Sequence, residues 1–296
     1  MGKLWVGGFF LFLTFANLTS GCFEHERGAL LRFKHSIAMD PSGRLSSWKG
    51  NNCCHWQGIG CDNSTAHVTK LELGNQHLGF VEVLKGNELN SSLAELTQLR
   101  VLDLSDNQLN SSIPFMNTVV DLNLKANEFL HYKDIGIWRF CQLKRLDLSY
   151  NSLEGRFTGP STNVSECAQY DLETLNLNEN RLSGEIPTSL VRLTALRELD
   201  LGWNELTGII PEALGNLTSL QELDLSSNKL TGSIPMSIGN LLLLRELNLF
   251  SNLLDGAIPF SLGRLVNLEF LDLQFNWFSS TLPLFLANLT ELHTLV

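Results

Sequence analysis

Apolar residues recur with a period of 24 positions over the second half of this chain. Each period starts with leucine, two variable residues, leucine, one variable residue and leucine. The last part of that pattern alternates apolar and polar positions, which predicts a short strand with one buried face. A unit this short cannot bury its own apolar face, so we expect the units to stack as a solenoid. The leucines that start the units are Leu172, Leu196, Leu220, Leu244, Leu268 and Leu292.

The same pattern continues toward the N-terminus with uneven spacing. It starts at Leu143, Val119, Leu99 and Val68. Residues 67–296 therefore predict nine full repeats and a truncated tenth. We expect the strands of successive units to pair in parallel. The predicted fold is an α/β repeat solenoid, a right-handed superhelix with a parallel sheet on its concave face.

An amide side chain occupies the ninth position of the repeats. Because it carries two donors and an acceptor, it can bond backbone groups of its own turn and of the next repeat that would otherwise be buried unpaired. We therefore predict a structural role for this column. Its members are Gln76, Asn107, Asn127, Asn151, Asn180, Asn204, Asn228, Asn252 and Asn276.

Four repeats continue after the asparagine with Leu-x-Gly-x-Ile-Pro. Glycine permits unusual backbone angles and proline fixes its own, so the chain is expected to leave the strand here and cross to the outer side. One short helical turn should follow, at residues 189–193, 213–217 and 237–241. The motif ends at Pro187, Pro211, Pro235 and Pro259. This consensus resembles the plant-specific class of extracellular leucine-rich repeats, over nearly the whole mature chain.

Residues 1–21 have the features of a secretory signal peptide, with Lys3, an uncharged and mostly apolar run at 4–13, and small residues at 19–21. That run is too short to span a bilayer comfortably, and no second run of about 18 or more apolar residues follows. We expect an exported product without membrane insertion in the chain as given. Glycosylation is predicted at the Asn-x-Ser/Thr sites Asn63, Asn90, Asn110, Asn163, Asn216 and Asn288.

All six cysteines follow the predicted signal peptide, and an even number is typical of disulfides in an exported protein. Sequence alone allows many connectivities. Because adjacent Cys53 and Cys54 are poorly placed to join each other, we expect three other pairs. These are Cys22 with Cys53, Cys54 with Cys61, and Cys141 with Cys167. The alternative is a zinc site made by Cys53, Cys54, His55, Cys61 and His67, but its spacing fits no common zinc pattern. No metal and no cofactor are therefore expected.

Residues 22–66 are expected to form a cap over the edge of the first repeat. The cap begins with a helix that has Glu24 and Glu26 in its first turn, and Trp48 and Trp56 are expected in its core. The apolar stripe of this helix consists of Ala29, Leu30, Phe33 and Ile37. Residues 26–34, 45–48 and 53–61 closely resemble the N-terminal cap of plant receptor-like proteins and receptor kinases. Polygalacturonase-inhibiting proteins carry a similar cap.

The formal net charge is −10, which argues against nucleic acid and anionic membranes as principal partners. One position between the strand leucines is always acidic or amide. Neighbours there, such as Asp200 and Asp224, should lie about 5 Å apart, which overlaps the spacing of a retaining glycosidase pair. A column filled in nearly every repeat is more typical of a fold consensus, so we expect no enzyme. The column contains Asp103, Asn123, Asp147, Asn176, Asp200, Asp224, Asn248 and Asp272.

The next two positions vary between repeats, and variation within a regular frame can encode specificity. Aromatic residues there are candidates because they are enriched in binding hot spots. We predict a ligand-binding strip on the concave face, roughly 40 Å long for strands about 4.8 Å apart. The alternative is that these side chains only cover neighbouring leucines. The candidate binding residues are Tyr150, Glu179, Trp203, Phe250 and Phe275.

The resemblance implies the ligand-binding ectodomain of a plant receptor-like protein. Such a protein recognises a protein or peptide signal of defence or development and acts with a co-receptor kinase. Because the chain stops inside the tenth repeat, we expect a truncated gene product or a fragment of a longer ectodomain. The resemblance also implies secretion to the apoplast or cell wall, or the plasma membrane within a longer receptor. The alternative function is a secreted inhibitor of a cell-wall-degrading enzyme such as a polygalacturonase.

Overall fold

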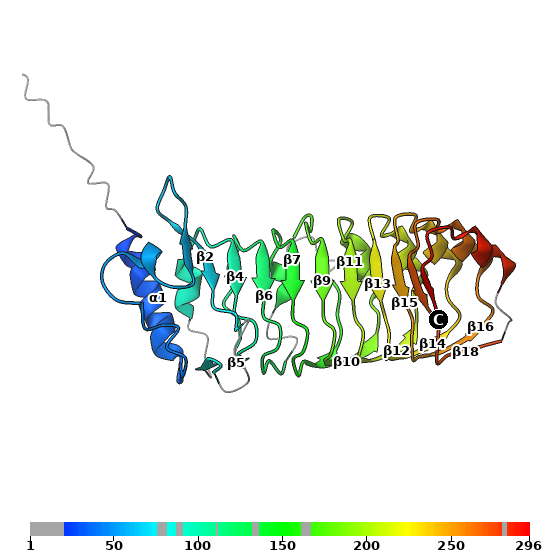
Figure 1. The fold of residues 1–296 in the computed structure, drawn as a ribbon, viewed down its shortest axis with the longest axis horizontal. Coiled ribbons are helices and arrows are strands. Elements are labelled where there is room, and N and C mark those ends of the chain that lie inside the picture. Colours follow the sequence, from blue (N-terminus) through cyan, green and yellow to red (C-terminus); the bar gives the residue numbers. More distant parts are fainter. Residues whose placement is uncertain are drawn as a thin grey trace, which may run out of the picture.

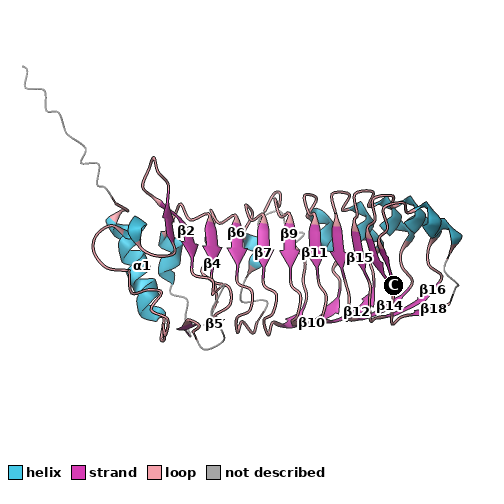
Figure 2. Cartoon of the chain, viewed as in Figure 1, coloured by secondary structure: helices cyan, strands magenta, loops and turns pink. Residues whose placement is uncertain are grey.

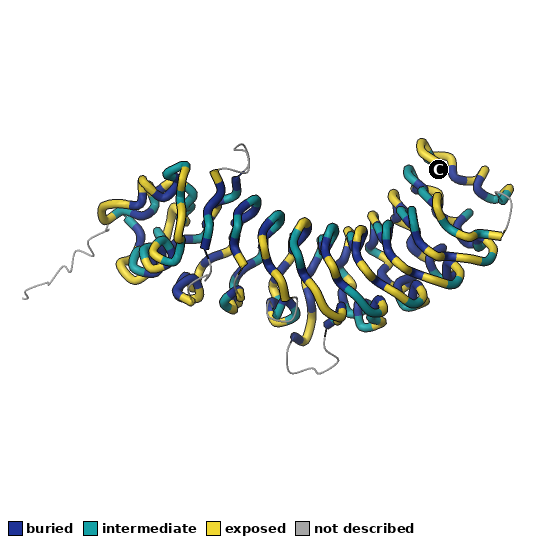
Figure 3. Tube along the Cα trace, turned by 90° about the horizontal axis from the view of Figure 1, so that it is seen from below, coloured by how far each residue is buried: buried dark blue, intermediate teal, exposed yellow. Residues whose placement is uncertain are grey.

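The computed structural model describes residues 21–75, 82–86, 91–110, 112–131, 136–160, 167–279 and 283–296. Over these ranges the chain coils repeatedly along one axis (Figure 1). Seen from below, the coils follow an arc (Figure 3). The predicted signal peptide up to residue 20, the amide Gln76 and the glycosylation sites Asn90 and Asn163 lie outside the described residues.

The main sheet lines the concave side of the arc (Figures 1 and 3). Strand β1 pairs antiparallel with β2, and the later neighbours in this sheet pair in parallel. In the register of β11 and β13, Leu199 faces Leu223, and both side chains are buried. The predicted solenoid with a parallel sheet is therefore confirmed. The strands, in sheet order, are β1 (Ile59–Cys61), β2 (Val68–Glu72), β4 (Val101–Asp103), β6 (Asp121–Asn123), β7 (Arg145–Asp147), β9 (Thr174–Asn176), β11 (Glu198–Asp200), β13 (Glu222–Asp224), β15 (Glu246–Asn248), β17 (Phe270–Asp272) and β19 (Thr294–Leu295).

A second parallel sheet lies along one edge of the solenoid, and sequence analysis did not predict it. It forms where the four Leu-x-Gly-x-Ile-Pro segments run side by side with the matching segments of the repeat before and the repeat after them. Gly208 has a φ of 79° there, and the matching glycines of neighbouring repeats share this left-handed conformation, as expected for a glycine at a turn. The strands are β8 (Glu154–Arg156), β10 (Arg181–Glu185), β12 (Glu205–Ile209), β14 (Lys229–Gly232), β16 (Leu253–Gly256) and β18 (Trp277–Phe278). A separate pair joins β3 (Lys85–Gly86) to β5 (Gln108–Leu109).

Short 3-10 helices occupy the crossing segments on the side away from the concave sheet (Figure 2). The three predicted helical turns are confirmed, each starting one residue earlier than expected. Proline precedes each of the last five of these helices, where its fixed φ suits the entry to a helix. In the repeats they are η2 (Ser91–Glu95), η3 (Ile137–Arg139), η4 (Thr188–Arg192), η5 (Glu212–Asn216), η6 (Met236–Asn240), η7 (Phe260–Arg264) and η8 (Leu284–Asn288), while η1 (Cys53–His55) lies in the cap.

The asparagine column forms a hydrogen-bonded ladder, which confirms its structural role. The amide nitrogen of Asn204 donates to the carbonyl oxygens of Leu177, Leu201 and Gly202 at 3.0, 3.2 and 3.0 Å. Its oxygen accepts the backbone N–H of Leu182 at 2.9 Å. Leu177 and Leu182 belong to the preceding repeat, so the expectation that the amide reaches the next repeat was wrong. Each asparagine satisfies buried backbone groups of two coils.

The cap begins with helix α1 (Glu24–Ser36), as predicted. Glu26 lies in the first turn of this helix, as predicted, and its side chain is fully buried. One carboxylate oxygen accepts the backbone N–H of Val68 at 3.2 Å, and the other lies 3.0 Å from Nδ1 of His67. Glu26 therefore ties the cap to β2, because a buried carboxylate requires such partners. Its helical position alone did not reveal them.

The cap core contains the two predicted tryptophans. The rings of Trp48 and Trp56 stack with centroids 5.5 Å apart, and both side chains are buried. Arg44 is also buried, and its guanidinium donates to the carbonyl of Leu73 and to Oδ1 of Asn107, both at 2.7 Å. The structure contains the three expected disulfides, Cys22–Cys53, Cys54–Cys61 and Cys141–Cys167. The cap is thus bonded both internally and to the first repeats.

Candidate ligand-binding face

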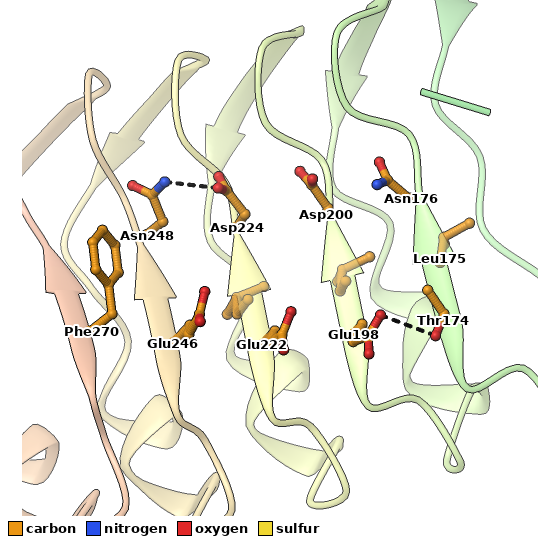
Figure 4. A pocket seen from close by; sticks show the side chains of 12 residues that line it. Thr174, Leu175, Asn176, Glu198, Asp200, Glu222, Asp224, Glu246, Asn248 and Phe270 are labelled. Atoms are coloured by element: carbon orange, nitrogen blue, oxygen red, sulfur yellow. Dashed lines mark hydrogen bonds between the residues drawn. The ribbon is translucent and has the colours of Figure 1, made fainter. Parts of the chain in front are cut away.

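The residues on either side of each central strand leucine face out of the concave sheet. On β9 to β17 they surround a hollow of about 250 Å³ (Figure 4). The positions before the leucines form a first row across the strands, and the positions after them form a second row. The first row is Thr174, Glu198, Glu222, Glu246 and Phe270. The second row is Asn176, Asp200, Asp224, Asn248 and Asp272.

The second row supports the turn that ends each strand. Oδ1 of Asp200 accepts the backbone N–H of Gly202 at 3.0 Å, and Oδ1 of Asn248 accepts that of Phe250 at 3.1 Å. An Asp or Asn side chain that bonds the backbone two residues later is a standard means of stabilising a turn. The same bond recurs at Asp103, Asn123, Asp147, Asn176, Asp224 and Asp272. The repeated Asp or Asn is therefore part of the fold.

Asp200 and Asp224 are paired in register on neighbouring strands. Burial raises the pKa of Asp200 to about 6, and the charge of Asp224 adds to the rise. Each carboxylate also accepts a bond from a neighbouring amide, Asn178 at 3.2 Å for Asp200 and Asn248 at 2.7 Å for Asp224. Turn and amide bonds thus account for both groups without a glycosidase role.

The first row contains carboxylates that form no ion pair. Oε2 of Glu198 accepts a bond from the hydroxyl of Thr174 at 3.2 Å. Within the described part of the chain, Glu222 and Glu246 form no ion pair, and both are exposed. Desolvation raises the pKa of Glu222, and the charges of Glu198, Glu246 and Asp200 raise it further. Sequence analysis missed this row, although glutamate recurs there every 24 residues in three successive repeats.

Acidic groups on the concave face of other strands, or just before a strand, do have basic partners. Glu173 lies 3.0 Å from Nζ of Lys144 and 3.8 Å from Nε of Arg197. Arg145 pairs with Asp121 across the strands β6 and β7. The contrast shows that cross-strand pairing is available in this fold. The glutamates of the first row lie together without it.

The predicted binding residues lie at the rim of the concave face and not on its strands. β11 ends at Asp200, and Trp203 follows in the turn that leaves the sheet. The φ angles of Tyr150, Glu179, Trp203 and Phe275 are 55°, 53°, 53° and 53°, in the left-handed region. Smaller residues at the same position of other repeats share this angle, among them Asp106, Ala126, Ser227 and Ser251. The ladder imposes the conformation whatever the side chain, so it is no sign of function by itself.

The rim aromatics differ in exposure. Tyr150, Trp203 and Phe275 expose 52%, 53% and 71% of their surface. Phe250 and Glu179 are half-buried. The structure brings Phe250 and Phe275 together, edge to face with centroids 5.2 Å apart. Tyr150 belongs to an earlier repeat, where Nζ of Lys125 lies 5.3 Å from its ring centroid.

The described glycosylation sites all have exposed asparagines, at Asn63, Asn110, Asn216 and Asn288. Asn216 ends η5 and Asn288 ends η8, so both lie away from the concave sheet. Glycans at these two sites would leave the first row open. Glycosylation itself stays a prediction.

The zinc alternative is wrong because all the cap cysteines are in disulfides. The described ranges contain no group of three or more His, Cys, Asp or Glu side chains that could hold a metal ion. Likewise, none of the helices in the described part of the chain combines the length and the apolar character that crossing a membrane requires.

Sequence families identify the class of protein. A leucine rich repeat N-terminal domain matches residues 23–62. Leucine rich repeat models match residues 98–116, 142–163, 170–230, 196–254 and 267–289. The chain is therefore a leucine-rich repeat protein with an N-terminal leucine-rich repeat domain, and its homologues are plant receptor-like proteins and receptor kinase ectodomains.

Two plant relatives illustrate this homology. Phytosulfokine receptor 1 of Arabidopsis thaliana is 33% identical over 219 residues, which cover 64% of this chain and 20% of the receptor. Receptor-like protein EIX2 of Solanum lycopersicum is 41% identical over 119 residues, which cover 36% of this chain and 12% of that protein. The chain thus spans a fifth or less of the length of these relatives.

Among solved structures, the chain is similar to the leucine-rich repeat ectodomain of the Arabidopsis receptor kinase HAESA. That ectodomain was solved in complex with an N-terminal extended IDA peptide hormone ligand. The TM-score is 0.76 at 34% identity, and the match covers 90% of this chain and 44% of the HAESA chain. Another HAESA structure, with a TM-score of 0.67 at 32% identity, contains the IDA peptide and the co-receptor SERK1. This match covers 92% of this chain and 41% of the HAESA chain.

Proposed function

We propose that this chain is an extracellular ligand-binding region of a plant receptor-like protein, and that it binds a peptide or protein signal on its concave face. One observation carries the proposal: an open hollow lies over β9 to β17 in a chain that superposes on a peptide-bound ectodomain over 90% of its length. The protein acts by binding and not by catalysis. Specificity resides in the first row and the rim aromatics, because these vary while the leucine frame stays constant.

The signal is one of defence or development, and a co-receptor kinase completes the response. The relation to HAESA, which was solved with a peptide hormone and a co-receptor, supports this part of the proposal. The predicted signal peptide and the three disulfides support export, because disulfides persist in oxidising compartments. We therefore expect the protein in the apoplast, or at the plasma membrane within a longer receptor.

The test uses glycans to block one face at a time. Peptides are selected from a random display library on the secreted, glycosylated protein, and their affinities are then measured for two variants. Glu246→Asn with Asn248→Thr creates a glycosylation site in the hollow, and the threonine hydroxyl can keep a weaker turn bond. Leu242→Thr creates the matched control at Asn240, which ends η6 as the natural site Asn216 ends η5.

We expect the concave glycan to abolish binding of the selected peptides and the control glycan to leave it unchanged. Mass spectrometry establishes that each site carries a glycan, and thermal unfolding establishes that each variant is folded. Binding that survives the concave glycan, or that is lost equally with the control glycan, would contradict the proposed face.

A secreted inhibitor of a cell-wall-degrading enzyme would use the same concave strip. An inhibition assay with purified fungal polygalacturonases distinguishes the two functions. Inhibition that the concave glycan removes would favour the inhibitor over the receptor. The absence of inhibition, together with peptide selection, is the result we expect.

A further inference from the structure

We infer that the hollow over β9 to β17 takes a basic peptide segment in extended conformation. Two Lys or Arg side chains, two residues apart, lie on Glu222 and Glu246, and an apolar side chain two residues further on packs against Phe270. This inference rests on the proposed function and names the class of its ligand. It concerns the part of the concave face where the first row runs from acidic to aromatic residues (Figure 4).

Charge complementarity is the first argument. Three glutamates lie on adjacent strands in register, and the second row adds Asp200 and Asp224 beside them. Within the described residues, no basic side chain pairs with Glu222 or Glu246, although Arg197 and Arg245 directly precede the neighbouring strands β11 and β15. Those two arginines turn to Glu173 and Glu269 instead, at 3.8 and 2.9 Å. A bound ligand would therefore have to supply the positive charges that neutralise this row of carboxylates.

The second argument is the match of spacings. Neighbouring strands are about 4.8 Å apart, so Glu222 and Glu246 lie about 5 Å apart along the solenoid axis, and Phe270 lies about 5 Å further on. In an extended peptide, side chains on one face recur about every 6.8 Å. A peptide that lies across the strands can thus place two consecutive same-face side chains within the row. Long Lys or Arg side chains cover the remaining difference, because their stems are flexible.

The third argument is the aromatic end of the hollow. Phe270 on β17 is the register partner of Glu246 on β15, so the first row changes from a carboxylate to an aromatic ring between these two neighbouring strands. The rim beyond it carries Phe250 and Phe275 in edge-to-face contact, and Phe275 is 71% exposed. An aromatic pair at one end of a charged strip is typical of an anchoring subsite. The occupant therefore has an apolar side chain beyond its two basic ones.

The test uses four synthetic octapeptides and isothermal titration calorimetry on the intact secreted protein. The first has lysine at its second and fourth positions, leucine at its sixth, and serine or glycine elsewhere. The second and third replace both lysines with glutamine or with glutamate. The fourth keeps the lysines and replaces the leucine with serine.

We expect the first peptide to bind at least about tenfold more tightly than the second and third at about 50 mM salt. It should also bind several-fold more tightly than the fourth, and its affinity should fall as salt is added.

The protein variants locate the effect. Glu222→Gln with Glu246→Gln should weaken binding of the lysine peptide about fivefold to tenfold. The control Glu128→Gln with Glu185→Gln makes the same change in net charge at exposed positions outside the first row and should change affinity less than twofold. Equal losses in both variants, equal binding of the lysine and glutamine peptides, or no binding of the lysine peptide would overturn the inference. If library peptides bind the concave face but are not basic, this inference fails and the proposed function stands.

Discussion

The N-terminal half of the solenoid, residues 68–171, and its C-terminal half, residues 172–279, share a leucine frame but hold it together differently. Repeats of the N-terminal half start at 68, 99, 119, 143 and 172, so the intervals are 31, 20, 24 and 29 residues, while every interval of the C-terminal half is 24. The first half is braced by Arg44 and by the Cys141–Cys167 disulfide. The asparagine ladder runs through both halves, and in the second half the strands β10 to β18 of the second sheet join it.

The charges on the concave face follow the same division. In the N-terminal half, Arg145 pairs with Asp121, and Lys144 reaches Glu173 at the boundary. In the C-terminal half, the first row leaves Glu222 and Glu246 without such partners among the described residues. In the regular repeats, backbone and asparagine hydrogen bonds already hold the coils together, so the outward side chains are not required for stability. Those side chains are then free to be chosen for a ligand, and we expect the two halves to respond differently to mutation.

The largest effect is expected in the ladder of the regular half. Asn204→Ala leaves the carbonyls of Leu177 and Leu201 and the N–H of Leu182 without their partner in a buried site. Each unsatisfied buried group costs about 1–3 kcal/mol, so the free energy of unfolding should fall by about 4 kcal/mol. Asn151→Ala makes the same change at a less buried member of the column and should cost less. Urea denaturation measures the free energy of unfolding of both variants. Equal losses would contradict the difference between the two halves.

The next effect concerns the irregular half. Replacing Cys141 and Cys167 together with Ala removes a bridge between residues 26 positions apart. The chain-entropy model predicts a loss of about 3 kcal/mol. Hydrogen exchange should show that protection falls around η3 and β7 while β13 to β17 keep theirs. A uniform fall over the whole solenoid would show that the two halves unfold as one unit.

A smaller effect depends on pH and on the second row. The folded-state pKa of Asp200, about 6, is higher than the ordinary value of 3.8, so the folded protein holds this proton more tightly than the unfolded chain does. The free energy of unfolding should therefore fall as the pH rises from about 4 to about 6. Asp200→Asn removes this loss and keeps the turn, because Asn248 makes the same turn on β15.

The Asp200→Asn variant should be more stable than the natural protein by about 1 kcal/mol above pH 6 and equally stable near pH 4. Thermal unfolding at a series of pH values measures the difference. A difference that stays constant across the series would show that the carboxylate is not the cause.

The smallest effect is expected at the rim. Trp203 is half exposed and has a left-handed backbone that suits asparagine better than tryptophan. Trp203→Asn should therefore leave the free energy of unfolding unchanged or raise it by less than about 1 kcal/mol. Together with Phe250→Ala it should abolish binding of peptides selected on the natural protein. A large loss of stability would show that these aromatics belong to the core.

The regular half was the easier half to predict from the sequence, because one signal repeats at one interval. The strand leucines, the asparagine ladder and the 3-10 turns all follow from that repetition. The three expected disulfides are also present, although excluding a pair between adjacent Cys53 and Cys54 still leaves many connectivities open. The second sheet was missed because glycine and proline near its strands indicate a turn, and its pairing depends on neighbouring coils.

The positions of single side chains were harder to predict. Glu26 looks like an exposed helix-start acid until β2 is packed against it, and Arg44 looks like a surface cation until Asn107 lies beside it. Trp203 and Phe275 were expected on the concave strip because the positions after the strand leucines were taken to face outward, whereas β11 ends at Asp200 and β17 at Asp272. The first row was not predicted, although glutamate recurs at one position of three successive repeats and the register of the strands brings the three side chains together.

The most direct test of the account is to find where a ligand contacts the concave face. A peptide selected on the intact protein is synthesised with a photoreactive residue at its centre, crosslinked to the protein and located by mass spectrometry. We predict crosslinks to the first row and the neighbouring rim, between Thr174 and Trp277. Crosslinks confined to the cap, to the N-terminal half or to the 3-10 helices η4 to η8 would contradict the assignment of the C-terminal concave face as the binding surface.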